Sequence, residues 1–279
     1  MINTFFLAAI AIVGAPAHPA SPKVNSTVES VRVVPAITLP ANPDGRHIDE
    51  YCTDLNPRFD IKPESAGGQY AASRGWLVTS ETKLGKYDAV TIVGALDAAT
   101  SGTCVHRDGN LAIFDGSQLI AIAYKRPQRS SEEAYPDGIG SAEQMDPRRI
   151  RLRWGLPAAP MADVVLRDGF YVERTPEEDT ACGGRVLVPN IFELDIRKAR
   201  RKLLAYGWKP SRSSEKNYGL EVALREQGVV EAEICSGTGY GFCIFNYAKP
   251  KGVSLVVTSA GDGDTVISYD VQCGRRRSM

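Results

Sequence analysis

The pattern of apolar and polar positions predicts short β-strands along much of the chain. In the first half, a weak helix at residues 64–74 ends at Gly75, and strands are expected at 75–82, 89–93, 110–114 and 118–124. Asp115-Gly116 between the last two strands indicates a hairpin, because glycine accepts positive φ at little cost.

Strict alternation marks a further strand at residues 149–154, with Ile150, Leu152 and Trp154 on one face. Asp168-Gly169, flanked by two short apolar runs, predicts another hairpin.

The second half contains the clearer helix. Asp195 can cap it, Ile196, Ala199 and Leu203 fall on one face, and Gly207 ends it. Strands are then expected at 229–235, 243–247, 253–259 and 265–273.

The two halves share an order of features at an offset of about 131 residues, which is typical of an internal repeat. Trp76 corresponds to Trp208, Phe114 to Phe245 and Cys52 to Cys182. The sequence therefore predicts an α+β fold of two related modules, each a helix packed on a small antiparallel sheet and each disulfide-bonded. The first module spans 46–174, with a long polar loop at 126–147, and the second spans 181–273.

The N-terminal 45 residues are expected to lie outside both modules. Residues 1–20 combine the apolar run FFLAAIAIVG with the small residues of APAHPA, which is typical of a secretory signal peptide cleaved after Ala17 or Ala20. Residues 21–45 contain several prolines and predict an extended linker. No later segment is apolar enough to span a membrane, so a periplasmic or secreted protein is expected.

Six cysteines follow the predicted signal peptide: Cys52, Cys104, Cys182, Cys235, Cys243 and Cys273. An even set in an oxidising compartment predicts three disulfides. Cys52 and Cys104 are the two in the first module and should pair. The repeat slightly favours Cys182 with Cys235 and Cys243 with Cys273, while the alternative closes the glycine-rich loop with Cys235 and Cys243 and joins Cys182 to Cys273.

Charge adds an exclusion. Thirty-three basic and thirty-three acidic residues cancel, which argues against a nucleic-acid partner, because such affinity comes largely from phosphate neutralisation. The basic run at 197–202 on the second helix is interpreted as a solvated face, with an anion or nucleic-acid site as the alternative.

Catalytic patterns are sparse. Cys104-Val105-His106 would place a thiolate near a base, but a disulfide at Cys104 is the favoured interpretation. A serine triad would need His47 or His106, and no G-x-S-x-G elbow precedes a helix. No catalytic residue, metal ligand or cofactor is assigned, and an enzyme is the less favoured expectation.

The glycine-rich segment 237–241 is the main candidate for binding. It lacks the Gly-Lys-Ser/Thr and the following helix of a phosphate loop, so it is interpreted as a tight connection between cysteines or as a rigid loop that presents Tyr240 and Phe242. Trp208 is a third candidate ligand-binding residue, with packing between helix and sheet as its alternative. Asp262-Gly263-Asp264 is a fragment of a calcium loop or, more simply, a hairpin turn.

Residues 188–261 resemble a PASTA domain, a small envelope module of bacterial penicillin-binding proteins and serine/threonine kinases. The matching features are Val188-Pro189-Asn190, the helix with Ala199 and Leu203, Gly207-Trp208, and Lys251-Gly252 before SLVVTSAG. The chain departs from the family at CSGTGYGFC, so no family binding residue is transferred.

The resemblance implies binding, with peptidoglycan, a peptide or an envelope protein as partner. Export, disulfides and the repeat agree with a non-enzymatic envelope-binding protein. The alternatives are an inhibitor of an envelope-acting hydrolase, presenting the loop from Cys235 to Cys243, and a hydrolase with an unrecognised site.

Overall fold

The computed structural model describes residues 22–54, 59–100, 102–126, 138–155, 158–212, 219–237, 239–261 and 265–274. The predicted signal peptide and the Asp262-Gly263-Asp264 turn lie outside these residues. Strands account for 52% of the described residues and helices for 13%, so the protein is mostly β. The prediction of two α+β modules is therefore wrong as a fold class.

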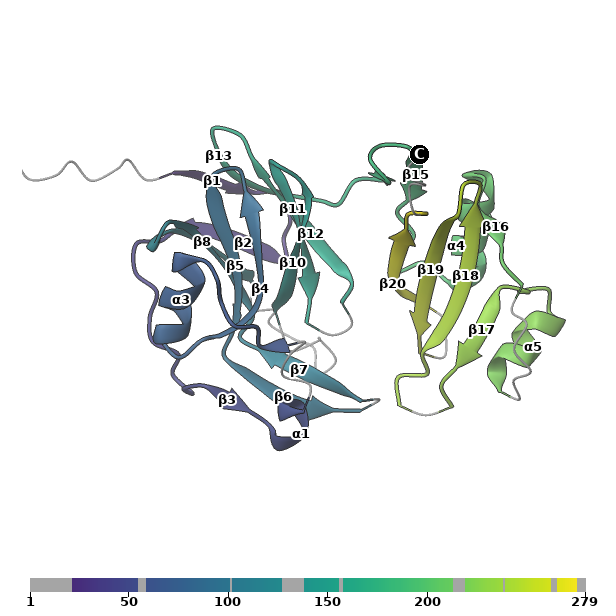
Figure 1. Ribbon diagram of the computed structural model, residues 1–279, viewed down its shortest axis with the longest axis horizontal. Helices are drawn as coiled ribbons and strands as arrows, with labels where there is room; N and C mark the ends of the chain where they lie inside the picture. Colours follow the sequence, from purple (N-terminus) through teal and green to yellow (C-terminus); the bar gives the residue numbers. More distant parts are fainter. Residues whose placement is uncertain are drawn as a thin grey trace, which may run out of the picture.

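Residues 22–173 form a sandwich of two five-stranded sheets (Figure 1). One sheet has the order β1 (Lys23–Ser26), β13 (Gly169–Glu173), β12 (Pro160–Leu166), β11 (Arg149–Trp154) and β10 (Ile139–Asp146). The other has the order β2 (Val31–Pro35), β9 (Gln118–Lys125), β8 (Asn110–Asp115), β5 (Tyr87–Val93) and β4 (Leu77–Leu84). Fully buried side chains from both sheets, including Ile113, Leu152 and Phe170, meet in one core between them.

The sandwich corrects two predictions about loops. Residues 21–45, expected as a linker, contribute β1 and β2, which pair with β13 and β9. Residues 139–146, expected within a polar loop, form β10 against β11. Residues 139–146 are too polar to predict a strand by themselves, whereas residues 31–35, VRVVP, are a β-branched run that the surrounding prolines obscured. Each segment is held as a strand by pairing with its neighbour in the sheet.

Helix α3 (Ala66–Ser73) covers the outer face of the second sheet (Figure 1). Gly67 and Gly68 in its first turn allow this approach, because a Cβ at Gly67 would lie 2.5 Å from the Phe114 ring. A small third sheet, β3 (His47–Ile48), β6 (Ala95–Ala99) and β7 (Thr103–Arg107), lies beside α1 (Glu50–Thr53). The Cys52–Cys104 disulfide joins α1 to β7, as predicted.

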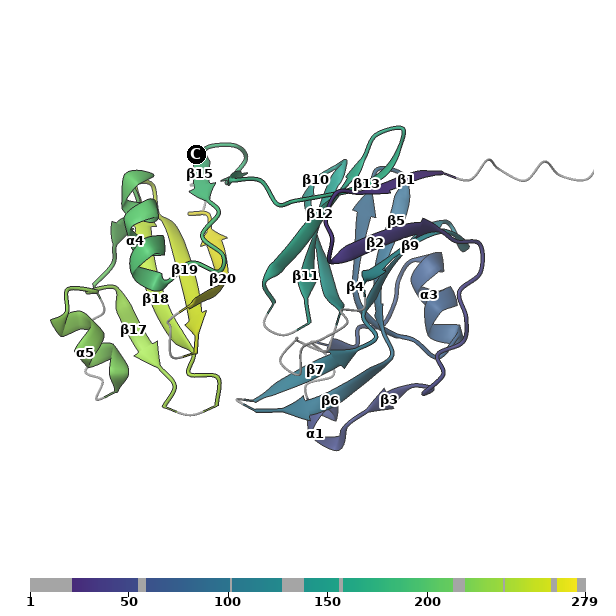
Figure 2. The same ribbon diagram turned by 180° about the vertical axis from the view of Figure 1, so that it is seen from behind.

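Residues 178–274, here called the C-terminal unit, form a second core. The elements are β14 (Glu178–Ala181), β15 (Val186–Pro189), α4 (Ile196–Ala205), β16 (Lys209–Pro210), α5 (Leu220–Glu226), β17 (Ala232–Cys235), β18 (Cys243–Lys249), β19 (Val253–Ala260) and β20 (Thr265–Gln272). The sheet has the order β16-β18-β19-β20, with β17 also paired to β18. Helix α4 lies on one face of this sheet, nearest the viewer in Figure 2.

The repeat is local rather than global. Gly75 and Gly207 end their helices with φ of +84° and +77°. The following tryptophan N–H then bonds the carbonyl five residues earlier, Trp76 to Ala71 at 3.3 Å and Trp208 to Leu203 at 3.1 Å. Beyond these turns the topologies diverge, since Trp76 leads into the long edge strand β4 whereas Trp208 leads into the two-residue β16.

The disulfides of the C-terminal unit follow the less favoured alternative. Cys182 is bonded to Cys273 and Cys235 to Cys243, so the repeat-based pairing is wrong. Cys235 and Cys243 are directly opposite in the β17–β18 ladder, with Cα atoms 4.1 Å apart. Cross-strand register therefore decides the pairing.

Candidate functional site

The predicted binding loop forms a rigid tip at the end of β17 and β18. We call this loop, residues 235–243 with Thr238 outside the described residues, the aromatic tip. The Cys235–Cys243 disulfide closes it, and the Ser236 N–H donates to the Phe242 carbonyl at 2.7 Å. The Gly261 N–H donates to the Tyr240 carbonyl at 2.8 Å, which ties the tip to the end of β19.

A buried carboxylate anchors the base of the aromatic tip. Glu221 in α5 is 2% exposed and accepts hydrogen bonds from the N–H groups of Gly219 at 2.9 Å and Cys235 at 3.1 Å. Burial by itself would raise the pKa of Glu221, but these backbone donors outweigh it and hold the pKa below its ordinary value. An ionised Glu221 thus fixes Cys235 relative to α5.

Tyr240 and Phe242 are brought together, as the binding interpretation requires. Their rings stack with centroids 5.5 Å apart and an interplanar angle of 30°. Both side chains are half-buried. Beside them Ile234 is 53% exposed, and its β17 position pairs with Ile244 of β18.

The sheet face that carries Ile234 and Ile244 is the one opposite α4. Side chains on the other face, such as Phe245 and Leu255, pack with the helix in the core. No described helix covers the Ile234 face, which is turned toward the viewer in Figure 1. The aromatic tip and this face together form a rigid, partly apolar surface.

Trp208 is not part of that surface. It is 1% exposed and lies in the core of the C-terminal unit, with the Lys249 ammonium 4.8 Å from its ring centroid. Trp76 is similarly buried, and its indole N–H donates to the Pro40 carbonyl at 2.9 Å. Both tryptophans therefore pack in the cores of their units, and no ligand-binding role is proposed for Trp208.

The hypothesis of a reactive thiolate at Cys104 with His106 as its base is wrong, because Cys104 is bonded to Cys52. His106 is 5% exposed, and neither ring nitrogen has a hydrogen-bond partner. Burial lowers the pKa of His106 to about 4, so the imidazole is neutral at pH 7. It packs edge-on against Phe59, with centroids 5.6 Å apart.

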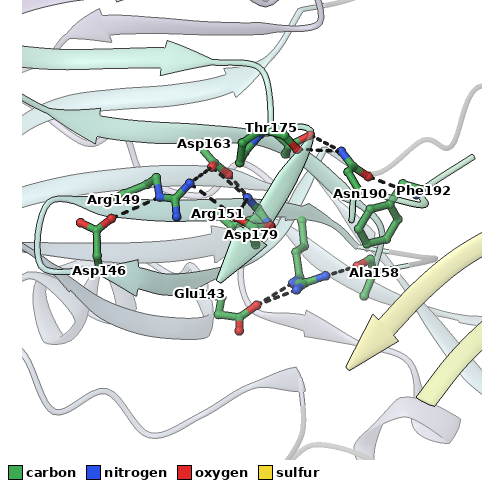
Figure 3. Close-up of polar contacts among 12 residues, drawn as sticks. Glu143, Asp146, Arg149, Arg151, Ala158, Asp163, Thr175, Asp179, Asn190 and Phe192 are labelled. Atoms are coloured by element: carbon green, nitrogen blue, oxygen red, sulfur yellow. Dashed lines mark hydrogen bonds and ion pairs between the residues drawn. The ribbon is translucent and has the colours of Figure 1, made fainter. Parts of the chain in front are cut away.

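A buried ion cluster joins the two units (Figure 3). Arg151 of β11 is 3% exposed and contacts Asp163 of β12, with its Nε 2.8 Å from Oδ1. Its other side meets Asp179 of β14, with Nη2 3.1 Å from Oδ1. Burial would lower the pKa of Arg151, but hydrogen bonds to the two carboxylates raise it instead.

The sequence pattern did not indicate this cluster, because alternation placed Arg151 on the solvent side of a half-buried strand. Its two counter-ions, Asp163 and Asp179, are distant in sequence, and only the fold brings them to Arg151. Arg149 adds a second cation, with Nη1 3.4 Å from Asp163 and 3.5 Å from Asp179. These aspartates are occupied by arginine, so the cluster is interpreted as structural.

The basic run on α4 is partly paired. Arg200 reaches the fully buried Glu231 at 2.7 Å, and the Tyr247 hydroxyl donates to the same carboxylate oxygen at 2.8 Å. Lys202 donates to the Asn190 carbonyl at 2.8 Å. Arg200 and Lys202 of the basic run therefore make structural hydrogen bonds within the C-terminal unit.

No group of three or more metal-ligating side chains occurs within the described ranges. Of the helices in those ranges, none is both long and apolar enough to cross a membrane.

Comparison with known proteins gives no relative: no family model, no curated protein and no solved structure matches the chain. The PASTA resemblance of residues 188–261 stays a prediction. The three disulfides indicate an oxidising compartment.

Proposed function

We propose that this chain is an exported, non-enzymatic binding protein of the cell envelope or its surroundings, and that it engages a partner protein through the aromatic tip. The observation that supports this is the stacked Tyr240–Phe242 pair, held at the end of a sheet by a disulfide. Aromatic side chains on rigid supports carry much of the energy of protein interfaces.

The shape of the surface favours a macromolecular partner over a small molecule. Small ligands are held in concave pockets, whereas Ile234 projects with half of its side chain in water. A partner that covers Ile234, Ile244 and the aromatic tip would bury contiguous apolar area without reordering the loop, which lowers the entropic cost of binding.

A second candidate is the inhibition of an envelope-acting hydrolase. It is favoured by the same rigidity, because a loop fixed by a disulfide and by hydrogen bonds at its base can enter an active-site cleft at little entropic cost. The partner would then be an enzyme whose activity falls on binding.

The test is capture by the mature, oxidised protein from envelope extract and, separately, on purified peptidoglycan. Phe242→Ala and Ile234→Glu should abolish capture of a discrete protein. The matched control is Ile37→Glu, which makes the same change at an exposed isoleucine of the sandwich, 78% exposed against 53% for Ile234, and should leave capture intact. Capture that is equal in all variants would contradict the proposal. Retention on peptidoglycan alone would also contradict a partner protein and would identify the cell-wall polymer as the ligand. Measuring the hydrolase activity of the captured partner with and without this chain separates inhibition from simple binding.

A further inference from the structure

The sandwich contains a cleft that the sequence did not indicate. It has a volume of about 440 Å³ and lies where three hairpin turns converge: β4–β5 at Lys86, β8–β9 at Asp115 and β12–β13 at Arg167 and Asp168. The chain entering β1 at Pro22 and leaving β2 at Ile37 completes the wall. This volume falls within the range of about 300–1,000 Å³ that is usual for small-ligand sites.

The floor of the cleft is apolar and preformed. Tyr87 and Phe170 lie edge to face with ring centroids 5.2 Å apart, and Leu119 and Leu166 extend the apolar lining. Phe170 and Leu119 are almost completely buried, so they support the floor from within the core. The apolar surface that a ligand can reach belongs to Tyr87 and Leu166, which are half-buried.

Ile37 is the exception on the wall, because 78% of its surface is exposed. It follows β2, whose end is fixed by the hydrogen bond from the Ala36 N–H to the Ile120 carbonyl at 3.0 Å. An isoleucine held in water on the rim of an apolar cleft gains burial when a ligand enters.

The rim carries both signs of charge in equal number. Lys86 pairs with Asp115 on one wall, and on another Asp168 accepts from Lys23 at 2.6 Å and from the Tyr171 hydroxyl at 2.8 Å. Arg167 pairs with Glu173 at 2.6 Å. Hydrogen bonds from Lys23 and then Tyr171 lower the pKa of Asp168 to about 2, so it is anionic at neutral pH.

These rim pairs are exposed, so water already screens them and they hold their partners weakly. A ligand can therefore exchange its own charged groups into them. Since the charges that line the cleft cancel, a ligand that carries one ammonium and one carboxylate meets the rim without leaving a net charge.

We propose that this cleft binds short zwitterionic peptides with an apolar side chain, the side chain against Tyr87 and Leu166 and the two termini on the charged rim. This site is separate from the aromatic tip and does not depend on the function proposed for it. The carboxylate would face Lys86, and the ammonium would face Asp115 or Asp168.

The probe is the dipeptide Leu-Phe with free termini, titrated into ¹⁵N-labelled mature protein and followed by amide shifts. We expect saturable binding with a Kd of about 0.1–1 mM, as suits a ligand of this size, and shifts centred on the three turns. Ile37→Glu should weaken binding about tenfold or more, since it places a carboxylate on the apolar wall. Ile234→Glu is the matched control and should bind as wild type does.

The charged rim is tested with blocked peptides. N-acetyl-Leu-Phe and Leu-Phe-amide should each bind several-fold more weakly than the free dipeptide. Lys86→Met should weaken the free dipeptide several-fold yet leave Leu-Phe-amide unchanged, because the amide has no carboxylate for Lys86 to meet.

The proposal is overturned if shifts do not saturate by about 10 mM, if Ile37→Glu binds normally, or if blocked and free peptides bind equally. Because Ile37→Glu alters the cleft and Ile234→Glu alters the sheet beside the tip, failure here leaves capture through the aromatic tip to be judged separately.

Discussion

Arg151 in the sandwich and Asp179 in the C-terminal unit form an ion pair beneath the surface, with 3% and 9% of their side chains exposed. Asp163 completes the coordination of the guanidinium from the adjacent strand. The Tyr269 hydroxyl of β20 is buried nearby, and burial followed by the charge of Asp179 raises the pKa of this tyrosine. Asp179 of β14 thus makes a buried ion pair between the two units.

Removing that carboxylate should be costly. We expect Asp179→Ala to lower the free energy of unfolding by about 3 kcal/mol, because Arg151 would keep only one of its two buried counter-ions. Denaturant unfolding followed by tryptophan fluorescence measures this. Asp168→Ala, which breaks an exposed pair, is the control and should change stability little. Equal effects of the two substitutions would refute a structural role for the cluster.

The two C-terminal disulfides should differ in their contribution. In the chain-entropy account a crosslink stabilises more as its loop lengthens, giving about 4–5 kcal/mol for Cys182–Cys273 and about 2–3 kcal/mol for Cys235–Cys243. Paired Cys→Ser variants, compared by denaturant unfolding, check the order. A larger loss from the short loop would contradict the chain-entropy account for this unit.

His106 should make stability depend on pH. Its folded pKa of about 4 lies below the ordinary value of 6.5, so the unfolded chain takes up the proton first as pH falls. Stability is therefore expected to fall from about pH 6.5 downward, by about 3 kcal/mol once pH reaches 4. Comparison with His106→Phe isolates this contribution, because phenylalanine keeps the ring and cannot titrate. Parallel pH profiles for the two proteins would contradict the assignment.

Trp208 and Ile234 should separate folding from binding. Trp208→Ala removes a side chain that is 1% exposed and should cost about 3–5 kcal/mol. Ile234→Glu, on the exposed sheet face, should cost less than about 1 kcal/mol while abolishing capture. Thermal unfolding measured beside the capture assay tests both. Capture lost only in proportion to stability would argue against a binding role for this face.

Local chemistry explains what could be predicted from the sequence. The helix from Asp195 to Gly207 is confirmed because its cap, apolar face and terminal glycine act within a few residues of one another. The hairpin at Asp115-Gly116 is confirmed for the same reason. The tight connection between Cys235 and Cys243 also follows from local sequence, since glycines lie between the two cysteines, whereas its role in binding stays a proposal.

Only the tertiary structure decided the strand pairing, the disulfide pairing and the buried contacts, because these depend on which segments distant in sequence meet in the fold. β1 and β2 exist because β13 and β9 offer open edges, and nothing in residues 21–45 encodes those edges. Cys182 pairs with Cys273 because strand register had already placed Cys235 opposite Cys243. The repeat predicted two similar modules from two similar helix ends. A Gly-Trp turn, however, determines only the local backbone at the end of its helix and not the topology that follows. Burial of Trp208, the counter-ions of Arg151 and the cleft beside Ile37 all arise from packing between elements, and no local pattern contains that information.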